Sequence, residues 1–357
     1  MLTLQDVLAA LGVVLNGIPQ MIYAMSFGFL AGPTAIAFII AAVGMVAYGT
    51  VMPISMQAET IALAGTMGRS VRERLSIVLF SGILMAILGA FGLLRHIIDF
   101  AGDSVIFGMK VGVGIILARV AFEMVKANRL VGIISTAVAL VVWALSQNLV
   151  YVIVSSVVAS SVAAYIKNKG PIDGIESEKF KFSLHKPMLN FNIVRATLAL
   201  VCLTIGANIA FGGITAGMSG AEANIDGLTV YSGLASVGSA MFGGAPVEAI
   251  ISATGAAPNP MWAGVLMMGL FALILITGLL PKIARFVPMQ SIAGFLFVLG
   301  ALVTVPINAW LAFGGATPPE AMAAGVTIVV TALADPFIGL VAGIILRIAA
   351  QFFGLSF

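Results

Sequence analysis

The chain has 357 residues, of which 61% are hydrophobic and only 9% are charged, and its mean hydropathy is +1.15. Soluble domains carry about 25% charged residues, so this composition excludes a soluble globular protein and indicates a chain that crosses a membrane many times. The formal net charge of +3 gives no basic stripe for phosphates, so no nucleic-acid partner is expected. The single cysteine, Cys202, excludes a disulfide within the chain and a multi-cysteine metal site. We expect no cofactor and no metal.

Apolar runs long enough to cross a bilayer can be counted in chain order. The first half contains runs at about 7–30, 33–51, 74–94, 104–122, 130–147 and 149–166, with a shorter run at 53–67. The second half contains runs at about 192–217, 227–242, 260–281, 287–306, 318–334 and 336–353, with a shorter run at 244–256. The first run has no charged leader and no cleavage site, so we expect a retained helix rather than a signal peptide.

These runs predict an all-α polytopic membrane protein with seven plus seven segments, fourteen in all. An odd number of crossings in each repeat places the second copy upside down in the membrane, which is the inverted-repeat plan of many carriers. We expect the first repeat at 1–166, a polar connecting loop at 167–190 and the second repeat at 190–357.

The two short runs contain stretches, 57–66 and 246–255, that align at one offset of 189 residues (248 − 59), which places Glu59 on Glu248. A run of about 14 residues spans about 21 Å as a helix, less than the hydrocarbon core of about 30 Å. We therefore predict two short half-helices at the third and tenth segments. Interrupted segments at matching places in two halves indicate a carrier's binding site, and an ionisable residue at that depth is a functional hypothesis.

The opening helices of the two halves carry amides in mid-span, Asn16 and Gln20 in one and Asn208 in the other. Glycines at matching places, Gly17 and Gly206, allow close approach to the short segments. A purely structural role as hydrogen bonds between helices is the alternative for each amide. Their agreement with the repeat favours a role in ligand binding.

Residues 242–255, which run Phe-Gly-Gly-Ala-Pro through to Thr-Gly, resemble the tenth segment of the uracil/xanthine/purine permeases, the nucleobase–cation symporters. Residues 94–99 with 112–115, and residues 281–294, are similar to further segments of that family. The resemblance implies a core domain (segments one to four and eight to eleven) that moves against a gate domain (five to seven and twelve to fourteen). On the family alignment the binding glutamate falls on Ser252, one helical turn after Glu248.

The resemblance implies a secondary active transporter of a nucleobase or similar small planar solute in the cell membrane, coupled to protons or sodium and working by alternating access. We assign proton coupling to Glu248 and Glu59, because a buried carboxyl can take up and release a proton; static carboxylates in a structural network are the alternative. The expected partners are a small-molecule substrate, the co-transported ion and membrane lipid, with a homodimer as a further possibility. No catalytic residue is expected, and the predicted substrate-binding residues are Asn16, Gln20, Glu59, Thr60, Asn208, Glu248 and Ser252.

A second resemblance competes, since residues 18–24, with Ile-Pro-Gln followed by Tyr-Ala, look like the first helix of the sulfate permease family. That family shares the fold and implies anion transport, with the anion at the positive ends of the half-helices. Two carboxylates beside such a site would disfavour an anion, so this interpretation comes second. An intramembrane enzyme with Glu59 and Glu248 as an acid–base pair, or a channel, is less favoured, because no nucleophile–base motif and no pore ring accompanies them.

The remaining charges raise two questions. Lys110 and Arg119 lie inside the fifth run. We expect both side chains to extend to the membrane surface; for Lys110, a position facing the cleft between core and gate is the alternative. Asp335 is expected to cap a turn.

Most loop cations follow segments three, five, seven and eleven, which places the termini outside by the positive-inside rule. The nucleobase-permease resemblance places the termini inside, so the orientation stays open.

Overall fold

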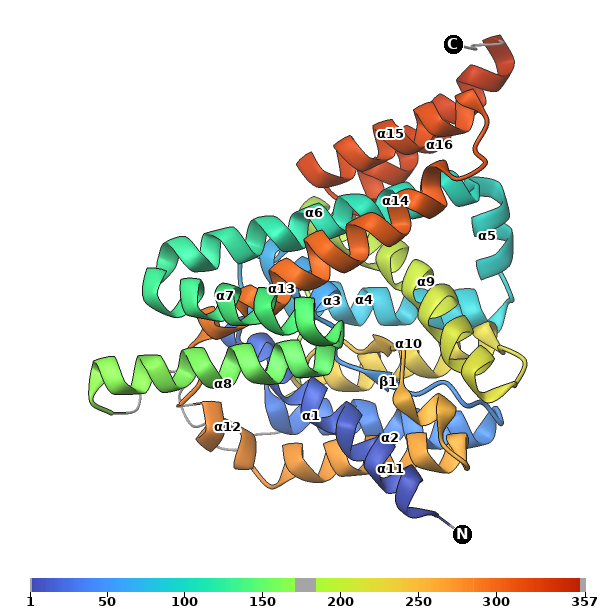
Figure 1. The fold of residues 1–357 in the computed structure, drawn as a ribbon. Coiled ribbons are helices and arrows are strands. Elements are labelled where there is room, and N and C mark those ends of the chain that lie inside the picture. The colour runs from blue at the N-terminus through green and yellow to red at the C-terminus, as the bar shows by residue number, and fades with distance from the viewer. Residues whose placement is uncertain (1, 171–183, 285, 354–357) are drawn as a thin grey trace.

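The structure, a computed structural model, describes residues 2–170, 184–284 and 286–353, and its elements follow the expected seven-plus-seven order (Figure 1). The first half contains α1 (Leu4–Ser26), α2 (Ala31–Ala47), β1 (Ile54–Ser55), α3 (Ala58–Met67), α4 (Val71–Ala90), α5 (Leu94–Ala101), α6 (Asp103–Ala127), α7 (Arg129–Ser146) and α8 (Leu149–Asn168). The second half contains α9 (Phe191–Ser219), α10 (Ile225–Met241), β2 (Glu248–Ala249), η1 (Ala253–Ala256), α11 (Pro260–Ile276), α12 (Leu279–Ala284), η2 (Met289–Ile292), α13 (Ala293–Phe297), η3 (Val298–Thr304), α14 (Val305–Phe313), α15 (Pro318–Leu333) and α16 (Pro336–Phe353).

Several helices begin at residues whose side chains satisfy the free backbone N–H groups of a first turn. In each case the capping oxygen accepts a hydrogen bond from the N–H three residues further on. These caps are Thr3, Ser70, Asn128, Asn190 and Asn224. The polar residues between the apolar runs therefore set where the membrane helices start.

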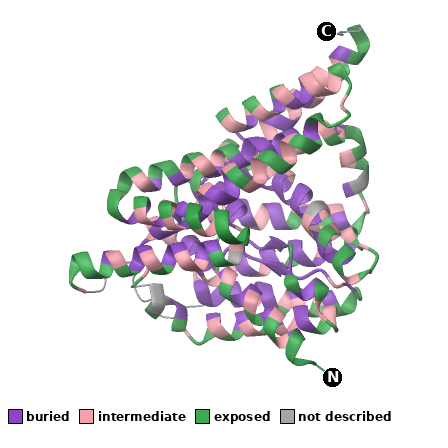
Figure 2. Cartoon of the chain, in the orientation of Figure 1, coloured by how far each residue is buried: buried purple, intermediate pink, exposed green. Residues whose placement is uncertain are grey.

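The outer surface is apolar, as a lipid-facing surface must be. Phe191, Leu145 and Trp310 are 85%, 83% and 79% exposed, and Figure 2 shows exposed residues along the outer faces of the helices, with buried ones at the centre. Within the described residues, eight helices are long and apolar enough to cross a membrane. An exposed apolar surface of this size would cause aggregation in water, but a protein that crosses the hydrocarbon core of a bilayer needs it. The chain is a multi-pass membrane protein.

The helices assemble into two bodies. In the core body α10 packs against α2 and α4, α11 packs against α2, and α9 packs against α4 and α3. In the gate body α6 packs against α14 and α15, α7 against α8, and α15 against α16 (Figure 1). This division agrees with the core and gate domains expected from the sequence.

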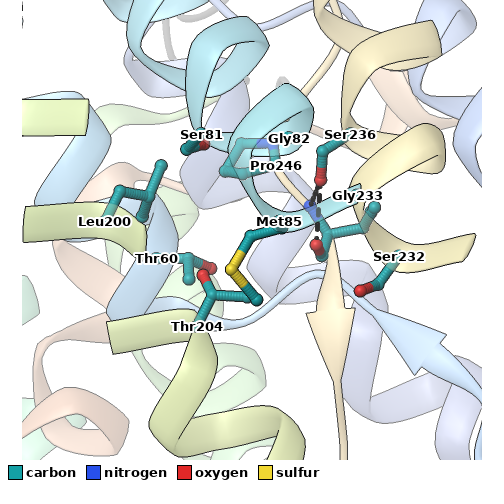
Figure 3. A pocket seen from close by; sticks show the side chains of 11 residues that line it. Thr60, Ser81, Gly82, Met85, Leu200, Thr204, Ser232, Gly233, Ser236 and Pro246 are labelled. Atoms are coloured by element: carbon teal, nitrogen blue, oxygen red, sulfur yellow. Dashed lines mark hydrogen bonds between the residues drawn. The ribbon is translucent and has the colours of Figure 1, made fainter. Parts of the chain in front are cut away.

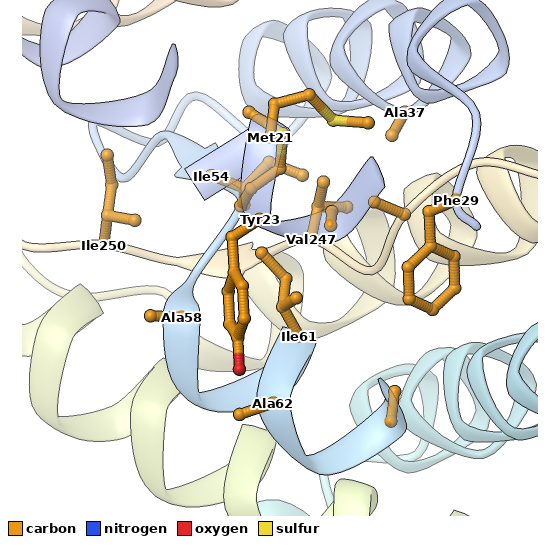
Figure 4. Packing of buried hydrophobic residues seen from close by; sticks show 14 of the residues in the cluster. Met21, Tyr23, Phe29, Ala37, Ile54, Ala58, Ile61, Ala62, Val247 and Ile250 are labelled. Carbon is orange, nitrogen blue, oxygen red and sulfur yellow. The ribbon is translucent and has the colours of Figure 1, made fainter. Parts of the chain in front are cut away.

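The third and tenth segments meet at the centre of the core as a two-stranded antiparallel sheet. Ile54 lies opposite Ala249, and Ser55 lies opposite Glu248. Apolar side chains from α1, the β1–α3 segment and the β2 segment, among them Tyr23, Ile61 and Ile250, pack around this crossing (Figure 4). The crossing therefore holds both short segments in one fixed arrangement.

Polar side chains of neighbouring helices satisfy the extended backbone of the tenth segment. Ser236 Oγ donates to the carbonyl of Val247 at 3.0 Å and accepts from its N–H at 3.4 Å, shown dashed in Figure 3. Thr215 Oγ1 donates to the carbonyl of Ile250 at 2.8 Å and accepts from the N–H of Ser252 at 3.1 Å. An unpaired backbone group at this depth costs several kcal/mol, so these hydroxyls are what allow a non-helical segment here.

Two expectations about the short segments need correction. The third segment contains the ten-residue helix α3, but the tenth is extended and forms only the one-turn η1. Pro246 and the β-branched residues after it favour an extended backbone over a helix. The strands begin at 54 and 248, an offset of 194 (248 − 54), so the counterpart of Glu248 in the first half is Ile54 and not Glu59.

An ion pair joins the two bodies. Arg195 Nε, in the first turns of α9, lies 2.5 Å from Asp335 Oδ2 in the turn between α15 and α16. Asp335 is 1% exposed, and its other carboxylate oxygen accepts from the N–H of Ile338 at 2.9 Å, which confirms its expected role as a cap.

We expect Asp335→Asn to lower stability by about 1 kcal/mol, because it removes one charge from a half-exposed pair while retaining the capping oxygen. Thermal unfolding of the purified protein in detergent measures the change. The matched control is Glu123→Gln, which breaks the exposed pair with Lys126 inside α6 and should leave the midpoint almost unchanged. Equal shifts in the two variants would show that the core–gate pair adds nothing.

Candidate functional site

A cavity of about 260 Å³ lies between the two bodies. The core side contributes Asn16, Gln20, Gln57, Glu59, Leu203, Ala207, Phe211, Ile214, Glu248 and Ile251. The gate side contributes Phe107, Lys110, Val113, Leu149, Phe295, Leu299, Val303, Thr304, Ile307, Asn308 and Leu311. The core therefore supplies most of the polar groups, and the gate supplies most of the apolar wall together with one cation.

Four polar side chains of the core end in the cavity with an oxygen that has no hydrogen-bond partner among the described residues. They are Asn16 Oδ1, Gln20 Oε1, Glu59 Oε2 and Glu248 Oε2. Glu59 and Glu248 are only 6% and 1% exposed. A buried polar atom without a partner costs about 1–3 kcal/mol, and such groups in a native structure need an explanation. Four of them around one cavity make it the candidate binding site, and that these four residues bind a substrate stays a prediction.

Lys110 is the cation of this site. Its side chain is 8% exposed, and its Nζ lies 5.5 Å from the ring centroid of Phe107 and 5.9 Å from that of Phe211. It interacts electrostatically with Glu248 and Glu59 without forming an ion pair within 4 Å among the described residues. The expectation that Lys110 extends to the membrane surface is wrong, because the carboxylates and the aromatic faces stabilise its charge inside. Arg119, further along α6, is exposed as expected.

Gly206 of α9 makes room for the lysine. A Cβ built at this position would lie 2.8 Å from Lys110 Cε. The absence of a side chain therefore lets the lysine stem lie against the helix backbone. The sequence pointed to Gly206 as a site of close approach to the short segments, and the structure shows that the group approaching it is Lys110.

Thr60 does not line the cavity but a much smaller pocket, which Figure 3 shows with Thr60 and Thr204 at its border. This pocket, of about 10 Å³, is bordered by hydroxyl groups from α3, α4, α9 and α10, and its volume corresponds to about one water molecule. The hydroxyls of Thr60 and Thr204 interact with the Glu248 carboxyl. Thr60 thus interacts with the Glu248 carboxyl and does not itself reach the cavity.

Asn208 and Ser252 also lie outside the cavity, contrary to expectation. Asn208 is fully buried; its Nδ2 donates to Thr229 Oγ1 at 3.1 Å and Ser232 Oγ at 3.3 Å, and its Oδ1 accepts from the N–H of Ala249. Ser252 is fully buried against Thr254. Asn208 is turned toward the backbone of the tenth segment, and Ser252 is the N-cap of η1, where its Oγ accepts a hydrogen bond from the N–H of Thr254 at 3.2 Å. Their geometry supports a structural role.

The gate wall was not predicted from the sequence. Residues Val298–Thr304 form a π-helix, η3, and Leu299, Val303 and Thr304 line the cavity from it. Pro306 follows directly and has no N–H for the helix ladder, which favours such an irregular turn. Stretches of π-helix are rare and frequently lie at functional sites. The proline inside the apolar run was the available signal.

We expect Gly206→Ala to weaken ligand binding about tenfold with little loss of stability. The added methyl displaces the far end of the flexible Lys110 side chain rather than a rigid group. A comparison of ligand affinity and thermal midpoint between the variant and the wild type tests this. A large fall in the midpoint with unchanged affinity would contradict it, and Gly213→Ala, with nothing within 4 Å of the new methyl group, is the control.

Two seven-segment halves that cross through a central strand pair, a core, a gate and a cavity between them define an inverted-repeat membrane transporter fold. The chain is similar to the transmembrane domain of a cyanobacterium bicarbonate transporter BicA (TM-score 0.66, 13% identity, 95% of this chain and 96% of that one). It is also similar to the murine Slc26a9 anion transporter in the inward-facing state (TM-score 0.72, 14% identity, 99% of this chain and 69% of that one). The structure of SLC26A9 gives a TM-score of 0.67 at 14% identity, over 99% of this chain and 66% of that one.

These likenesses establish the fold, and the proteins concerned are transporters rather than enzymes. No protein-family profile matches the chain, and no curated protein sequence matches it. These three structures agree with the sulfate permease-like alternative. They do not support the nucleobase permease resemblance.

Proposed function

We propose that the protein is a secondary active transporter that moves a small anion across the membrane by alternating access, coupled to protons. The observation that carries this proposal is Lys110, a buried cation in the cavity between core and gate, facing Glu59 and Glu248. It is the one cationic side chain among the described residues that line the cavity. The fold, shared with a bicarbonate transporter and an anion transporter, supports the same class.

The three charges explain the coupling. With Lys110 charged and both glutamates ionised, the site carries a net charge of −1 and repels an anion. Protonation of one carboxyl makes the site neutral, and protonation of both leaves it with the lysine charge alone. An anion in a desolvated cavity needs that opposite charge nearby, so it enters together with protons.

The placement of the charges couples binding to movement. Glu59 and Glu248 belong to the core, whereas Lys110 belongs to the gate, so a shift of one body against the other changes their separation. The lining includes Ile214 in the last turns of α9 and Leu311 in the last turn of α14. The Arg195–Asp335 pair joins the bodies at the first turns of α9.

A nucleobase or similar planar solute is the second candidate. The acceptors Asn16 Oδ1, Gln20 Oε1, Glu59 Oε2 and Glu248 Oε2 would suit the N–H groups of such a ring. Uptake assays that include uracil and xanthine beside inorganic and organic anions separate the two. Sodium coupling and a homodimer stay predictions.

Lys110→Met should abolish anion binding and uptake, because it replaces the cation by an apolar side chain of similar length. The matched control is Arg119→Met, which removes one positive charge from an exposed position on the same helix. Radiolabelled anion uptake into proteoliposomes measures the effect. Equal uptake by both variants would refute the role of Lys110.

Glu248→Gln should abolish accumulation driven by a proton gradient while leaving exchange of labelled for unlabelled substrate measurable. The amide keeps the shape of the carboxyl and holds the site in its neutral form. Glu59→Gln should have a smaller effect, since the hydroxyls of Thr60 and Thr204 that orient Glu248 remain in place. Loss of a charge-assisted hydrogen bond costs about 1.5–3 kcal/mol, so a purely binding role would show as roughly ten- to hundredfold weaker affinity in both modes. A Glu248→Gln variant that concentrates substrate like the wild type would make this carboxylate structural.

A further inference from the structure

The cavity lining combines a group of charged and amide side chains with a larger apolar surface. The charged side chains are Lys110, Glu59 and Glu248, and uncharged polar side chains come from both the core and the gate. The apolar part includes Phe107 and Phe211, whose rings flank Lys110, and the gate residues Phe295, Leu299, Val303 and Leu311. Phe295 is 2% exposed and Leu299 9%, so these side chains are parts of the packed gate and not loose surface groups.

An inorganic oxyanion fits this lining poorly. Such an ion is hydrated on all sides, and a site that binds it must replace that hydration with hydrogen-bond donors in several directions. Here Lys110 supplies the one cationic donor among the described lining residues, and the gate wall adds only Thr304 and Asn308 as uncharged polar side chains. An anion with a charged end and an apolar body matches both parts of the lining.

We propose that the transported anion is an amphipathic monocarboxylate, whose carboxylate lies at Lys110 and whose apolar body, about the size of a phenyl ring, lies against the gate wall. This inference rests on the proposed anion transport and adds the chemical class of the substrate. A single negative charge is specified because Lys110 is the one cation among the described lining residues.

The size of the cavity agrees with such a ligand. The cavity volume of about 260 Å³ is near the lower end of the range for small-molecule pockets. One water molecule needs a cavity of about 10–15 Å³, so this cavity has roughly twenty times that volume. An inorganic ion would leave most of the apolar wall in contact with water. A benzoate-sized body would move its own apolar surface from water to the wall formed by Phe211, Phe295 and Leu299, and gain the free energy of that transfer.

A ligand series on the purified full-length protein tests the substrate class. Binding and proteoliposome uptake are measured for acetate, butyrate, hexanoate and benzoate, and for sulfate, bicarbonate, uracil and the neutral isostere benzamide. We expect affinity to rise about fourfold with each buried methylene, benzoate to bind more tightly than acetate, and benzamide to bind at least tenfold more weakly than benzoate.

The outcomes separate the two proposals. If sulfate or bicarbonate is taken up and the affinity does not rise from acetate to hexanoate and benzoate, the proposed substrate class is overturned. Proton-coupled anion transport would still stand. Uptake of uracil without any anion, or binding of benzamide as tight as that of benzoate, would overturn the proposed function itself.

Variants of the gate wall give a second readout. Val303→Thr keeps the shape of the side chain but places a hydroxyl in the apolar wall, and should weaken benzoate about fivefold while changing acetate less than twofold. Val329→Thr, on the exposed face of α15 at 55% exposure, is the control and should change neither. A general structural effect would weaken both ligands equally, and that result, like no effect at all on benzoate, would contradict the placement of the apolar body.

Discussion

The antiparallel pairing of β1 with β2 in the middle of the membrane is the feature on which the rest of the structure depends. Backbone outside a helix is tolerated at this depth only if its polar groups are satisfied by the protein. Here the strands satisfy each other in part, and Ser236, Thr215 and Asn208 satisfy the remaining groups of the tenth segment. The resulting break in two segments opens the space in which a small molecule can reach buried side chains.

The strand pair also decides where the charges lie. Glu248 sits in β2, and Glu59 sits in the first turn of α3, so a rigid backbone element holds each carboxyl. Lys110 belongs to the other body, and its side chain packs against α9 at Gly206, where no Cβ is in the way. Neither the lysine nor the carboxylates would be stable alone at this depth, since an unpaired buried charge is very costly. The fold therefore brings a cation and two carboxyl groups to one cavity.

The two carboxylates of the short segments favoured the nucleobase permeases over the sulfate permeases in the sequence analysis, and the structure does not support that preference. Two carboxylates argue against an anion only while Lys110 is assigned to the membrane surface. With the lysine in the cavity this objection to an anion no longer holds, and the structures with a similar fold include a bicarbonate transporter and an anion transporter.

The sequence by itself determined the number and order of the segments, the two interruptions, and the participation of Asn16, Gln20, Glu59 and Glu248 in one cavity. These follow from apolar run length and from the cost of polar groups in lipid, which act locally along the chain. Only the tertiary structure decided that Asn208 and Ser252 are buried in the core, that Lys110 points inward and that a π-helix forms the gate wall. A strand and a helix turn side chains to different faces, and the direction of one long side chain depends on neighbours from distant segments, so no local pattern could specify them.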